Sequence, residues 1–500
     1  MKFATTTKLP QEITCDLLAA AFFEGEKLNP ELLKLDKILG GAISHRLSEK
    51  DFKGKNGETL LLFPGLGFAA KRLALLGLGK KNEYNLEKLR TAISSLALLV
   101  HKSQAKTLGI ILNQPWPKKI KTFQGSQALV ESLILGSYKF THYKQPSDSD
   151  QPNQLTEIVF LLNRQEQNQE ILKGAKYGEI LANIVNLTRD LGNHPANVAT
   201  PSHLAEHALR LARESKKIKV KILNRAQIKK EKMEALLAVA QGSAEEPKFI
   251  ILEYLATKKL PTVVLTGKGI TFDSGGISIK PSERLEEMKF DMAGAATVMG
   301  IIQAASALSL RLNLIGLIPA TENLPSGKAL KPGDIIRSRS GKTIEIINTD
   351  AEGRVILADA LDYAKKYQPD LVLNFATLTG ALAMALGDEL IGAFTNRPKL
   401  IPKLQKAAET TGEKICFLPL DQDYEQFLKS DFADVRNIGS TRSGDTINAA
   451  LFLEKFTSYP WIHLDIASVA WTTREKPYRP KGATGTSVRL AIEFLKNFKK

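Results

Sequence analysis

The sequence predicts an α/β protein with two domains, a smaller N-terminal α/β domain and a larger C-terminal domain built on a mostly parallel sheet. Three observations predict this fold class. The chain has 500 residues, which is more than one hydrophobic core usually organises. Apolar runs of strand length alternate with segments of helix length through both halves of the sequence. Such alternation favours parallel strands that are covered by helices on both faces.

The N-terminal domain is expected to hold at least four strands and one long amphipathic helix. The apolar runs at residues 59–63, 72–79, 107–112 and 157–162 predict the strands, and residues 85–102 predict the helix. A cluster of turn-forming residues at 144–154 predicts an exposed loop.

A hinge is expected after this domain, where asparagine, histidine and proline residues interrupt two helical segments near residues 193–201. We therefore expect an N-terminal domain at 1–170, a linker helix region at 171–190 and a second domain at 191–500. Strands of the second domain are predicted at residues 248–255, 262–269, 312–320, 370–380, 390–396 and 461–468.

The composition is that of a globular protein, with 43% hydrophobic and 24% charged residues. We expect a cytoplasmic protein without a membrane segment, because the sequence has no signal-like start and no apolar run of the roughly 18 to 20 residues that a span needs. The two cysteines, Cys15 and Cys416, lack metal-type spacing, so neither a disulfide nor a cysteine zinc site is expected.

The formal net charge of +16 raises the possibility of nucleic-acid binding. The densest basic run, residues 216–232, has a strand-like alternation followed by a helix-like segment and contains no aromatic residue. A solvated face of an α/β unit is the favoured interpretation of this run. DNA binding stays possible but is not expected to be the main role.

The segment NTDAEGRVILADAL, residues 348–361, places Asp350, Glu352 and Arg354 at alternate positions before an apolar run. One interpretation is a capping box, in which Thr349 caps a helix and Glu352 bonds back to it. The apolar spacing predicts a helix that begins near Arg354. The other interpretation is a loop of ligands at a strand end, where α/β sheets bind their ligands.

Two further segments carry charged residues next to glycines. KGITFDSGGISIKP, residues 268–281, holds Lys268, Asp273 and Lys280 after a predicted strand, and MKFDMAGAA, residues 288–296, holds Asp291. Each acidic residue alone is more often a turn former than a ligand. Four clustered carboxylates would repel one another, and divalent cations are the simplest partners for them. Oxygen-rich ligation suits manganese, magnesium or zinc, and two adjacent ions are a recurrent arrangement for hydrolysis.

These three segments resemble the signature segments of the leucyl aminopeptidase (cytosol aminopeptidase) family, peptidase family M17. The resemblance extends to TLTGA at residue 377, SDFADVRN at 430, HLDIAS at 463 and GATGTSVR at 482. It implies that the second domain is catalytic and releases N-terminal amino acids from peptides, with a leucine-type preference, by a water that two metals activate. A homohexamer is also implied. Ser468 departs from the family, which usually has glycine there, and we expect only a local packing change.

The resemblance also implies a role for each site residue. Asp273 and Glu352 would bridge two divalent ions, Mn²⁺ or Zn²⁺, while Lys268 and Asp291 complete one site and Asp350 the other. Lys280 would stabilise the oxyanion. Arg354 would hold a bicarbonate ion that acts as a general base. The substrate pocket would be formed by Met288, Thr377, Leu378 and Gly380.

Two alternatives to the peptidase are considered. The same carboxylates would suit a two-metal phosphoesterase, but Lys268 has no evident purpose as a ligand in such an enzyme. A DNA-binding regulator with a residual peptidase fold is compatible with the basic composition.

Overall fold

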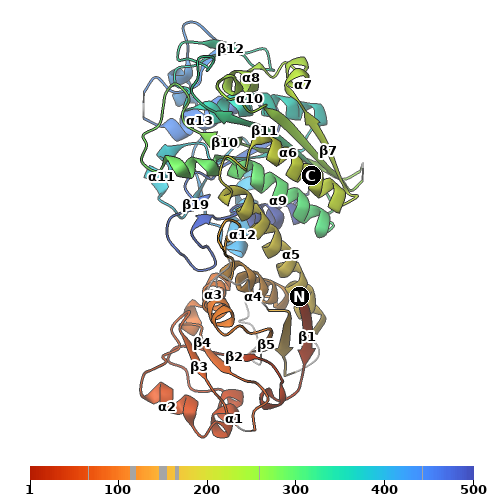
Figure 1. Ribbon diagram of the computed structural model, residues 1–500, viewed down its shortest axis with the longest axis vertical. Helices are drawn as coiled ribbons and strands as arrows, with labels where there is room; N and C mark the ends of the chain where they lie inside the picture. Colours follow the sequence, from red (N-terminus) through yellow and green to blue (C-terminus); the bar gives the residue numbers. More distant parts are fainter. Residues whose placement is uncertain are drawn as a thin grey trace. The chain divides into compact units, whose positions relative to one another are not determined.

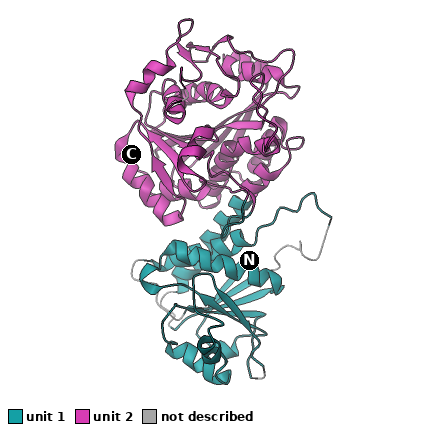
Figure 2. Ribbon diagram, turned by 90° about the vertical axis from the view of Figure 1, so that its left-hand side faces the viewer, with its two compact units in different colours: residues 1–186, 474–480 teal, residues 187–473, 481–500 magenta. Residues whose placement is uncertain are grey.

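The computed structural model describes residues 1–65, 67–112, 120–145, 155–163, 168–257, 259–441 and 443–499. It divides into two compact units, shown in Figures 1 and 2. Unit 1 comprises Met1–Asn186 and Arg474–Pro480, and unit 2 comprises Leu187–Thr473 and Lys481–Lys500. Of the loop predicted at 144–154, residues 146–154 lie outside the described residues.

Unit 1 is built on a six-stranded sheet with the order β1-β6-β5-β2-β4-β3. The pairings are parallel, except that β3 runs antiparallel to β4. The strands are β1 (Lys2–Thr6), β2 (Leu17–Phe22), β3 (Thr59–Leu62), β4 (Leu73–Gly77), β5 (Thr107–Ile111) and β6 (Glu157–Leu161). The helices are η1 (Pro10–Glu12), α1 (Pro30–Ile38), α2 (Ala42–Ser48), η2 (Lys81–Glu83), α3 (Leu86–Lys102) and α4 (Thr122–Gly136), followed by α5 (Asn168–Asn193).

The four strands and the helix that the sequence predicts for this part of the chain are present as β3, β4, β5, β6 and α3. The sequence analysis missed β1 and the central strand β2. Strand β2 contains Ala19, Ala20 and Ala21, and alanine is depleted in strands, so the run carries little strand signal.

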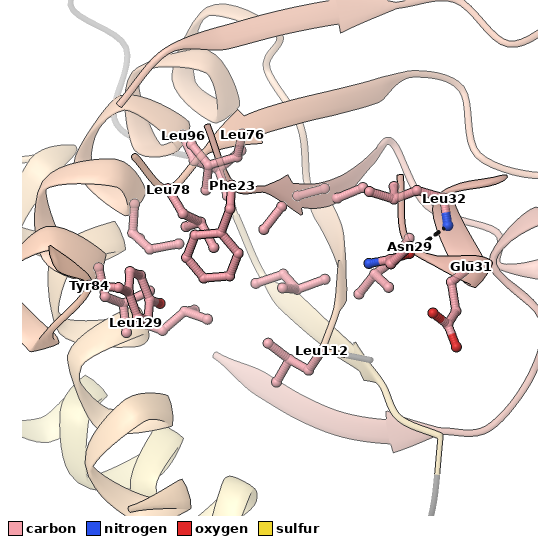
Figure 3. A pocket seen from close by; sticks show the side chains of 17 residues that line it. Phe23, Asn29, Glu31, Leu32, Leu76, Leu78, Tyr84, Leu96, Leu112 and Leu129 are labelled. Atoms are coloured by element: carbon pink, nitrogen blue, oxygen red, sulfur yellow. Dashed lines mark hydrogen bonds between the residues drawn. The ribbon is translucent and has the colours of Figure 1, made fainter. Parts of the chain in front are cut away.

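The small side chains of β2 border a cavity of about 80 Å³ beside strands β2, β4 and β5 (Figure 3). Its lining is mainly apolar and comes from both faces of the sheet, because Ala19 belongs to the core cluster under α3 and α4 and Ala20 to the cluster next to α1. Asn29, Glu31 and Tyr84 are the polar side chains among the described lining residues.

The segment Arg474–Pro480 lies in unit 1, whereas we had assigned residues 191–500 to one domain. The backbone N–H of Tyr478 donates to Ser94 Oγ at 2.8 Å, and its hydroxyl donates to Glu87 Oε1 at 2.6 Å. These contacts join positions nearly 400 residues apart, so they cannot be predicted from a local sequence pattern. Helix α5 continues through the predicted linker, and the division between the units falls within it.

Unit 2 is built on a mixed nine-stranded sheet with the order β16-β15-β18-β14-β9-β11-β8-β7, to which β10 is added by pairing with β11. Five of its eight pairings are parallel, in agreement with the mostly parallel sheet that we predicted. The strands are β7 (Ile218–Leu223), β8 (Lys248–Leu255), β9 (Thr262–Gly267), β10 (Gly269–Asp273), β11 (Asn313–Asn323), β14 (Leu371–Ala376), β15 (Ile391–Thr395), β16 (Ile415–Phe417) and β18 (Trp461–Asp465).

Helices cover both faces of this sheet. Gly316 of β11 faces Val298 of α9, while the next residue, Leu317, belongs to the core cluster that includes the buried residues of α10. The helices are α6 (Pro201–Glu214), α7 (Arg225–Lys230), α8 (Glu234–Val239), η5 (Ala240–Gly242), η6 (Leu285–Met292), α9 (Ala293–Ala307), α10 (Glu352–Ala364), η7 (Lys365–Tyr367), α11 (Gly380–Leu386), η8 (Pro398–Leu400), α12 (Ile401–Thr411), η9 (Gln422–Leu428), α13 (Asp445–Glu454) and α14 (Val488–Lys496). A three-stranded sheet contains β12 (Ile335–Arg337), β13 (Thr343–Glu345) and β17 (Val435–Arg436). A two-stranded sheet contains β19 (Trp471–Thr472) and β20 (Gly482–Ala483).

The basic run at 216–232 forms β7, at the edge of the sheet, and α7. Along β7 the exposure alternates from Ile218 to Ile222, with Lys219 and Lys221 exposed, Ile218 buried and Val220 and Ile222 half-buried. The run is therefore a solvated face, as we expected. Across the described part of the chain, no helix combines the length and the apolar character that crossing a bilayer needs.

Candidate metal centre

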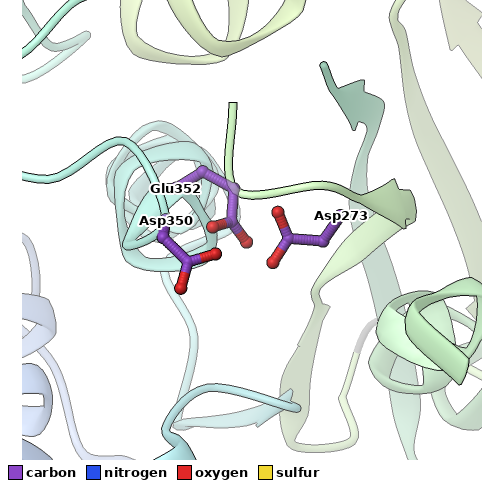
Figure 4. Close-up of side chains that lie close together, drawn as sticks. All are labelled: Asp273, Asp350 and Glu352. Carbon is purple, nitrogen blue, oxygen red and sulfur yellow. The ribbon is translucent and has the colours of Figure 1, made fainter. Parts of the chain in front are cut away.

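Three carboxylates that are remote in sequence meet at one edge of the unit 2 sheet (Figure 4). Asp273 is the last residue of β10, Asp350 lies in the loop before α10, and Glu352 is the first residue of α10. One oxygen atom from each carboxylate lies within 4.8 Å of the others. Asp273 and Glu352 are each only 2% exposed, so their charges are largely removed from water. A group of this kind needs positive charge close by.

The beginning of α10 decides between the two interpretations of the segment 348–361. The helix starts at Glu352, two residues before the predicted start, and its N-cap is Ala351, which makes no side-chain cap bond. The capping-box interpretation is therefore wrong. The carboxylate of Glu352 points instead to the other acidic side chains, as Figure 4 shows.

Lys268 and Asp291 lie beside Glu352. The ammonium of Lys268, in the bend between β9 and β10, is 2.7 Å from Asp291 Oδ2 and 2.8 Å from Glu352 Oε1. It also donates to the carbonyl oxygen of Thr377 at 3.0 Å. A glycine in α10 provides the space, because a Cβ at Gly353 would lie 2.5 Å from Cε of Lys268.

Lys280 joins the other two carboxylates. Its ammonium is 2.9 Å from Asp273 Oδ2 and 2.6 Å from Asp350 Oδ1. The chain reaches this place through a tight turn at Gly275, whose φ of +87° suits glycine and whose missing Cβ would lie 2.9 Å from Asp350 Oδ1. The two lysines therefore divide the four carboxylates into two pairs.

Burial and mutual repulsion change the protonation of these groups. Burial raises the pKa of Glu352 to about 8, and the charge of Asp273 contributes to the rise. Burial likewise raises the pKa of Asp291 to about 6, although Lys268 opposes this. Burial alone would lower the pKa of Lys268, but its carboxylate neighbours raise that pKa above the ordinary lysine value.

The donor set fits divalent cations. Among the described residues, Glu352 Oε2 has no hydrogen-bond partner although it is buried. A buried carboxylate oxygen without a donor is costly unless a cation contacts it. A metal ligand must be deprotonated, so Lys268 would lose a proton when an ion binds to it. The positive charge of the ion would then replace that of the ammonium beside these carboxylates.

Arg354 is the third residue of α10 and is 3% exposed. It donates through Nη1 to the carbonyl oxygen of Asn437 at 3.1 Å, and its Nη2 lies 3.6 Å from Asp445 Oδ1. Its Nε has no hydrogen-bond partner among the described residues. A buried guanidinium with donor capacity to spare can bind a small oxyanion.

A pocket of about 870 Å³ opens next to the carboxylates. All four residues that we expected in the substrate pocket, Met288, Thr377, Leu378 and Gly380, line it. Lys268, Asp273, Lys280, Asp291, Asp350 and Arg354 line it too. Thr377 does more than line the pocket, because its hydroxyl donates to Asp291 Oδ1 at 2.6 Å.

Sequence reasoning missed Asp465, the last residue of β18. Its buried carboxylate accepts hydrogen bonds from the backbone N–H groups of Leu378 at 3.0 Å and Ala467 at 3.1 Å, and from the hydroxyl of Thr379 at 2.7 Å. It thus ties together two strand-end loops that line the pocket. The HLDIAS motif contains this aspartate, but only its place at a strand end could have suggested the role. Nearby, the Ser468 hydroxyl donates to the carbonyl oxygen of Leu390 at 2.6 Å.

Comparisons with known proteins agree with this geometry. The model of the catalytic domain of the cytosol aminopeptidase family matches residues 186–492, and the model of its N-terminal domain matches residues 20–147. A probable cytosol aminopeptidase of Nitrosococcus oceani is 43% identical over 99% of this chain and 98% of its own length. A probable cytosol aminopeptidase of Syntrophotalea carbinolica is 42% identical over 96% of each chain.

Solved structures give the same result. A mutant of tomato leucine aminopeptidase has a TM-score of 0.89 at 34% identity, covering 100% of this chain and 97% of that one. The bottromycin maturation enzyme BotP in complex with Mn has a TM-score of 0.84 at 33% identity, covering 96% of this chain and 99% of that one. These matches do not favour the phosphoesterase or the DNA-binding regulator. The chain belongs to the cytosol aminopeptidase family and is a metal-dependent enzyme that hydrolyses N-terminal peptide bonds.

Proposed function

We propose that five residues of this chain hold two divalent ions for the removal of N-terminal amino acids from peptides. Asp273 and Glu352 serve both ions, and the other three ligands are Lys268, Asp291 and Asp350. The observation that carries the proposal is the convergence of the Asp273, Asp350 and Glu352 carboxylates within 4.8 Å. The ion pairs of Lys268 with Asp291 and Glu352 support the rest of the set.

Lys280 and Arg354 are the proposed catalytic residues. The two ions, when bound, supply Lewis acidity and an activated water for hydrolysis. The ammonium of Lys280 would donate to the carbonyl oxygen of the scissile bond and stabilise the charge that develops there. Arg354 would hold bicarbonate, and this anion would supply a general base at the site. The pocket side chains of Met288 and Leu378 would contact the side chain of the N-terminal residue, which suits a leucine-type preference.

The finer assignments belong to the same proposal. Manganese and zinc both suit carboxylates with one amine ligand, so we propose either as the working ion. The likeness to BotP in complex with Mn supports manganese. The family resemblance supports a homohexamer, and the names of the curated relatives support a cytosolic location.

Hydrolysis of a series of amino-acid amides, with and without a chelator, tests the proposal. We expect turnover of leucine amide, loss of activity after metal removal, and recovery on addition of Mn²⁺ or Zn²⁺. An N-acetylated leucine amide is the matched control, because it lacks the free amine. Full turnover by protein that elemental analysis shows to be metal-free would contradict the proposal, and phosphate-ester hydrolysis in its place would favour the phosphoesterase.

A further inference from the structure

Asn323, at the end of β11, makes hydrogen bonds that link Asp273 to the loop that carries Asp350. It is the register partner of Asp273, the last residue of β10, and is 5% exposed. Its Nδ2 donates to Asp273 Oδ1 at 2.8 Å and to the carbonyl oxygen of Thr349 at 3.0 Å. A carboxamide has two N–H donors, and both are therefore used. One side chain thus contacts the carboxylate of Asp273 and the residue that precedes Asp350.

These bonds determine how Asp273 is oriented. Its Oδ1 accepts from Asn323 and also from the backbone N–H of Gly275 at 2.9 Å. Two donors on one oxygen prevent the carboxylate from rotating, and Oδ2 is left facing the ammonium of Lys280 at 2.9 Å. The orientation of Asp273 is thus fixed by two neutral donors, neither of which belongs to the proposed ligand set.

Thr349 completes the link on the side of Asp350. Its hydroxyl donates to the carbonyl oxygen of Gly275 at 2.6 Å and accepts from the backbone N–H of Ser278 at 2.8 Å. Thr349 is 2% exposed, so these bonds are shielded from water. We call Asn323 and Thr349 together the seam, because they join the glycine turn to the loop that carries Asp350.

The seam opposes a repulsion that the cluster itself creates. Asp273 and Asp350 present oxygen atoms within 4.8 Å, and like charges at this distance favour separation of their loops, a repulsion that Lys280 offsets through its ion pairs with both. Hydrogen bonds to fixed backbone groups hold such ligands in place before a cation arrives, which lowers the cost of binding it.

We propose that Asn323 is a positioning residue for the metal centre, which sets the spacing between Asp273 and Asp350 through the seam. This inference rests on the proposed function, since it takes these two residues as metal ligands. It adds a residue outside the ligand set, whose removal should weaken metal binding without removing any ligand.

The same strand offers a matched control. Asn313, at the opposite end of β11, is also 5% exposed. Its Nδ2 donates to the carbonyl oxygens of Thr257 at 2.8 Å and Leu260 at 3.0 Å, and its Oδ1 accepts from the N–H of Ala256 at 3.0 Å. Replacing either asparagine with alanine removes a buried amide from β11, but only Asn323 contacts the proposed ligands.

The experiment measures Mn²⁺ and Zn²⁺ affinity by competition with a chelator, together with the melting temperature of each metal-free protein. We expect Asn323→Ala to bind metal about 10- to 100-fold more weakly than the wild type, as is typical for groups that orient metal ligands. Asn313→Ala should lower the melting temperature of the protein but keep the wild-type metal affinity. Equal affinities in the two variants would overturn the proposal.

A second pair of variants covers the case in which Asn323→Ala does not fold. Thr349→Val keeps the shape of the side chain but removes its hydroxyl, whereas Thr349→Ser keeps the hydroxyl. We expect weaker metal binding in Thr349→Val and recovery in Thr349→Ser. Wild-type metal affinity in Thr349→Val would contradict the proposal that the seam positions the metal ligands. A wild-type protein that binds no divalent ion would overturn the proposed function as well, so the two failures are distinguishable.

Discussion

The ammonium of Lys268 lies 2.8 Å from Glu352 Oε1, and both side chains are buried at the start of α10. Lys280 occupies the equivalent place between Asp273 and Asp350, but its side chain is 22% exposed whereas that of Lys268 is 4% exposed. Two lysines that form similar ion pairs thus differ in their access to the pocket. The more exposed one is better placed to meet a substrate.

Substitution of the two lysines should therefore give different results. We expect Lys268→Ala to lose bound metal, because it removes a ligand. Lys280→Ala should retain two metals and lower kcat by roughly 10²- to 10³-fold, the usual effect of removing one oxyanion donor. Metal content by elemental analysis and kcat on leucine amide separate the two outcomes. The exposed Lys328 provides the control variant. Loss of metal in Lys280→Ala with retention in Lys268→Ala would reverse the roles.

Arg354→Ala should lower activity without loss of metal, because the guanidinium contacts Asn437 and Asp445 and none of the carboxylates proposed as ligands. If Arg354 holds bicarbonate, the wild-type rate should rise with added bicarbonate and the variant rate should not. The measurement is kcat at several bicarbonate concentrations at constant ionic strength. Arg337→Ala, which removes an exposed arginine, is the control. An equal response to bicarbonate in Arg354→Ala and wild type would refute the role.

Asp465→Ala should damage the substrate pocket and leave the metals bound. The carboxylate holds the N–H groups of Leu378 and Ala467, so its loss frees both pocket loops. Misplacement of a substrate by about 1 Å can lower the rate by roughly 10²-fold, and we expect a decrease of this order in kcat/KM. Metal content and kcat/KM are measured together. A variant that loses metal in proportion to its activity would show that Asp465 acts on the metal centre and not on the pocket.

Asp359, on α10, should make stability depend on pH. It accepts from the backbone N–H groups of Leu236 at 3.0 Å and Arg339 at 2.7 Å, and burial raises its pKa to about 7. Because the folded pKa exceeds the unfolded value near 3.8, the protonated carboxyl stabilises the fold below about pH 4, and this contribution is lost as the pH rises to 7.

The test compares the melting temperatures of wild type and Asp359→Asn between pH 4 and pH 8. The Asn side chain has no titratable proton, so the wild type should lose stability relative to the variant as the pH rises. Asp359→Ala should cost about 1 to 3 kcal/mol near pH 4, because it leaves two buried N–H groups without an acceptor, and the difference from wild type should shrink as the pH rises. A pH-independent difference between wild type and Asp359→Asn would show that Asp359 does not titrate in this range.

The sequence predicted those elements of the fold that are recognisable from the residues of a single segment. Strands such as β9 and β14 are mainly apolar, and the loops that follow them hold Lys268 and Thr377 close in sequence to the strand. The carboxyl ends of parallel neighbours lie at one edge of a sheet, so residues on these loops could be expected to meet. The resemblance to a known family then supplied roles that spacing alone could not.

What the sequence did not indicate depends on contacts between distant segments. Asn323 lies three residues beyond the strand predicted at 312–320, and its importance depends on the pairing of β11 with β10. The same holds for Asp465, because two of its partners, Leu378 and Thr379, lie more than 80 residues away in the loop after β14. Strand β2 was missed for a different reason, because its alanines favour a helix locally and its burial in the sheet overrides that preference.

Gly353 places helix stability and metal binding in conflict. Alanine is favoured over glycine inside a helix by about 1 kcal/mol, so a change to alanine would ordinarily strengthen α10. Here the added methyl group would lie 2.5 Å from Cε of Lys268 and push that side chain away from Glu352. Selection for thermal stability and selection for catalysis would therefore act in opposite directions at this one position.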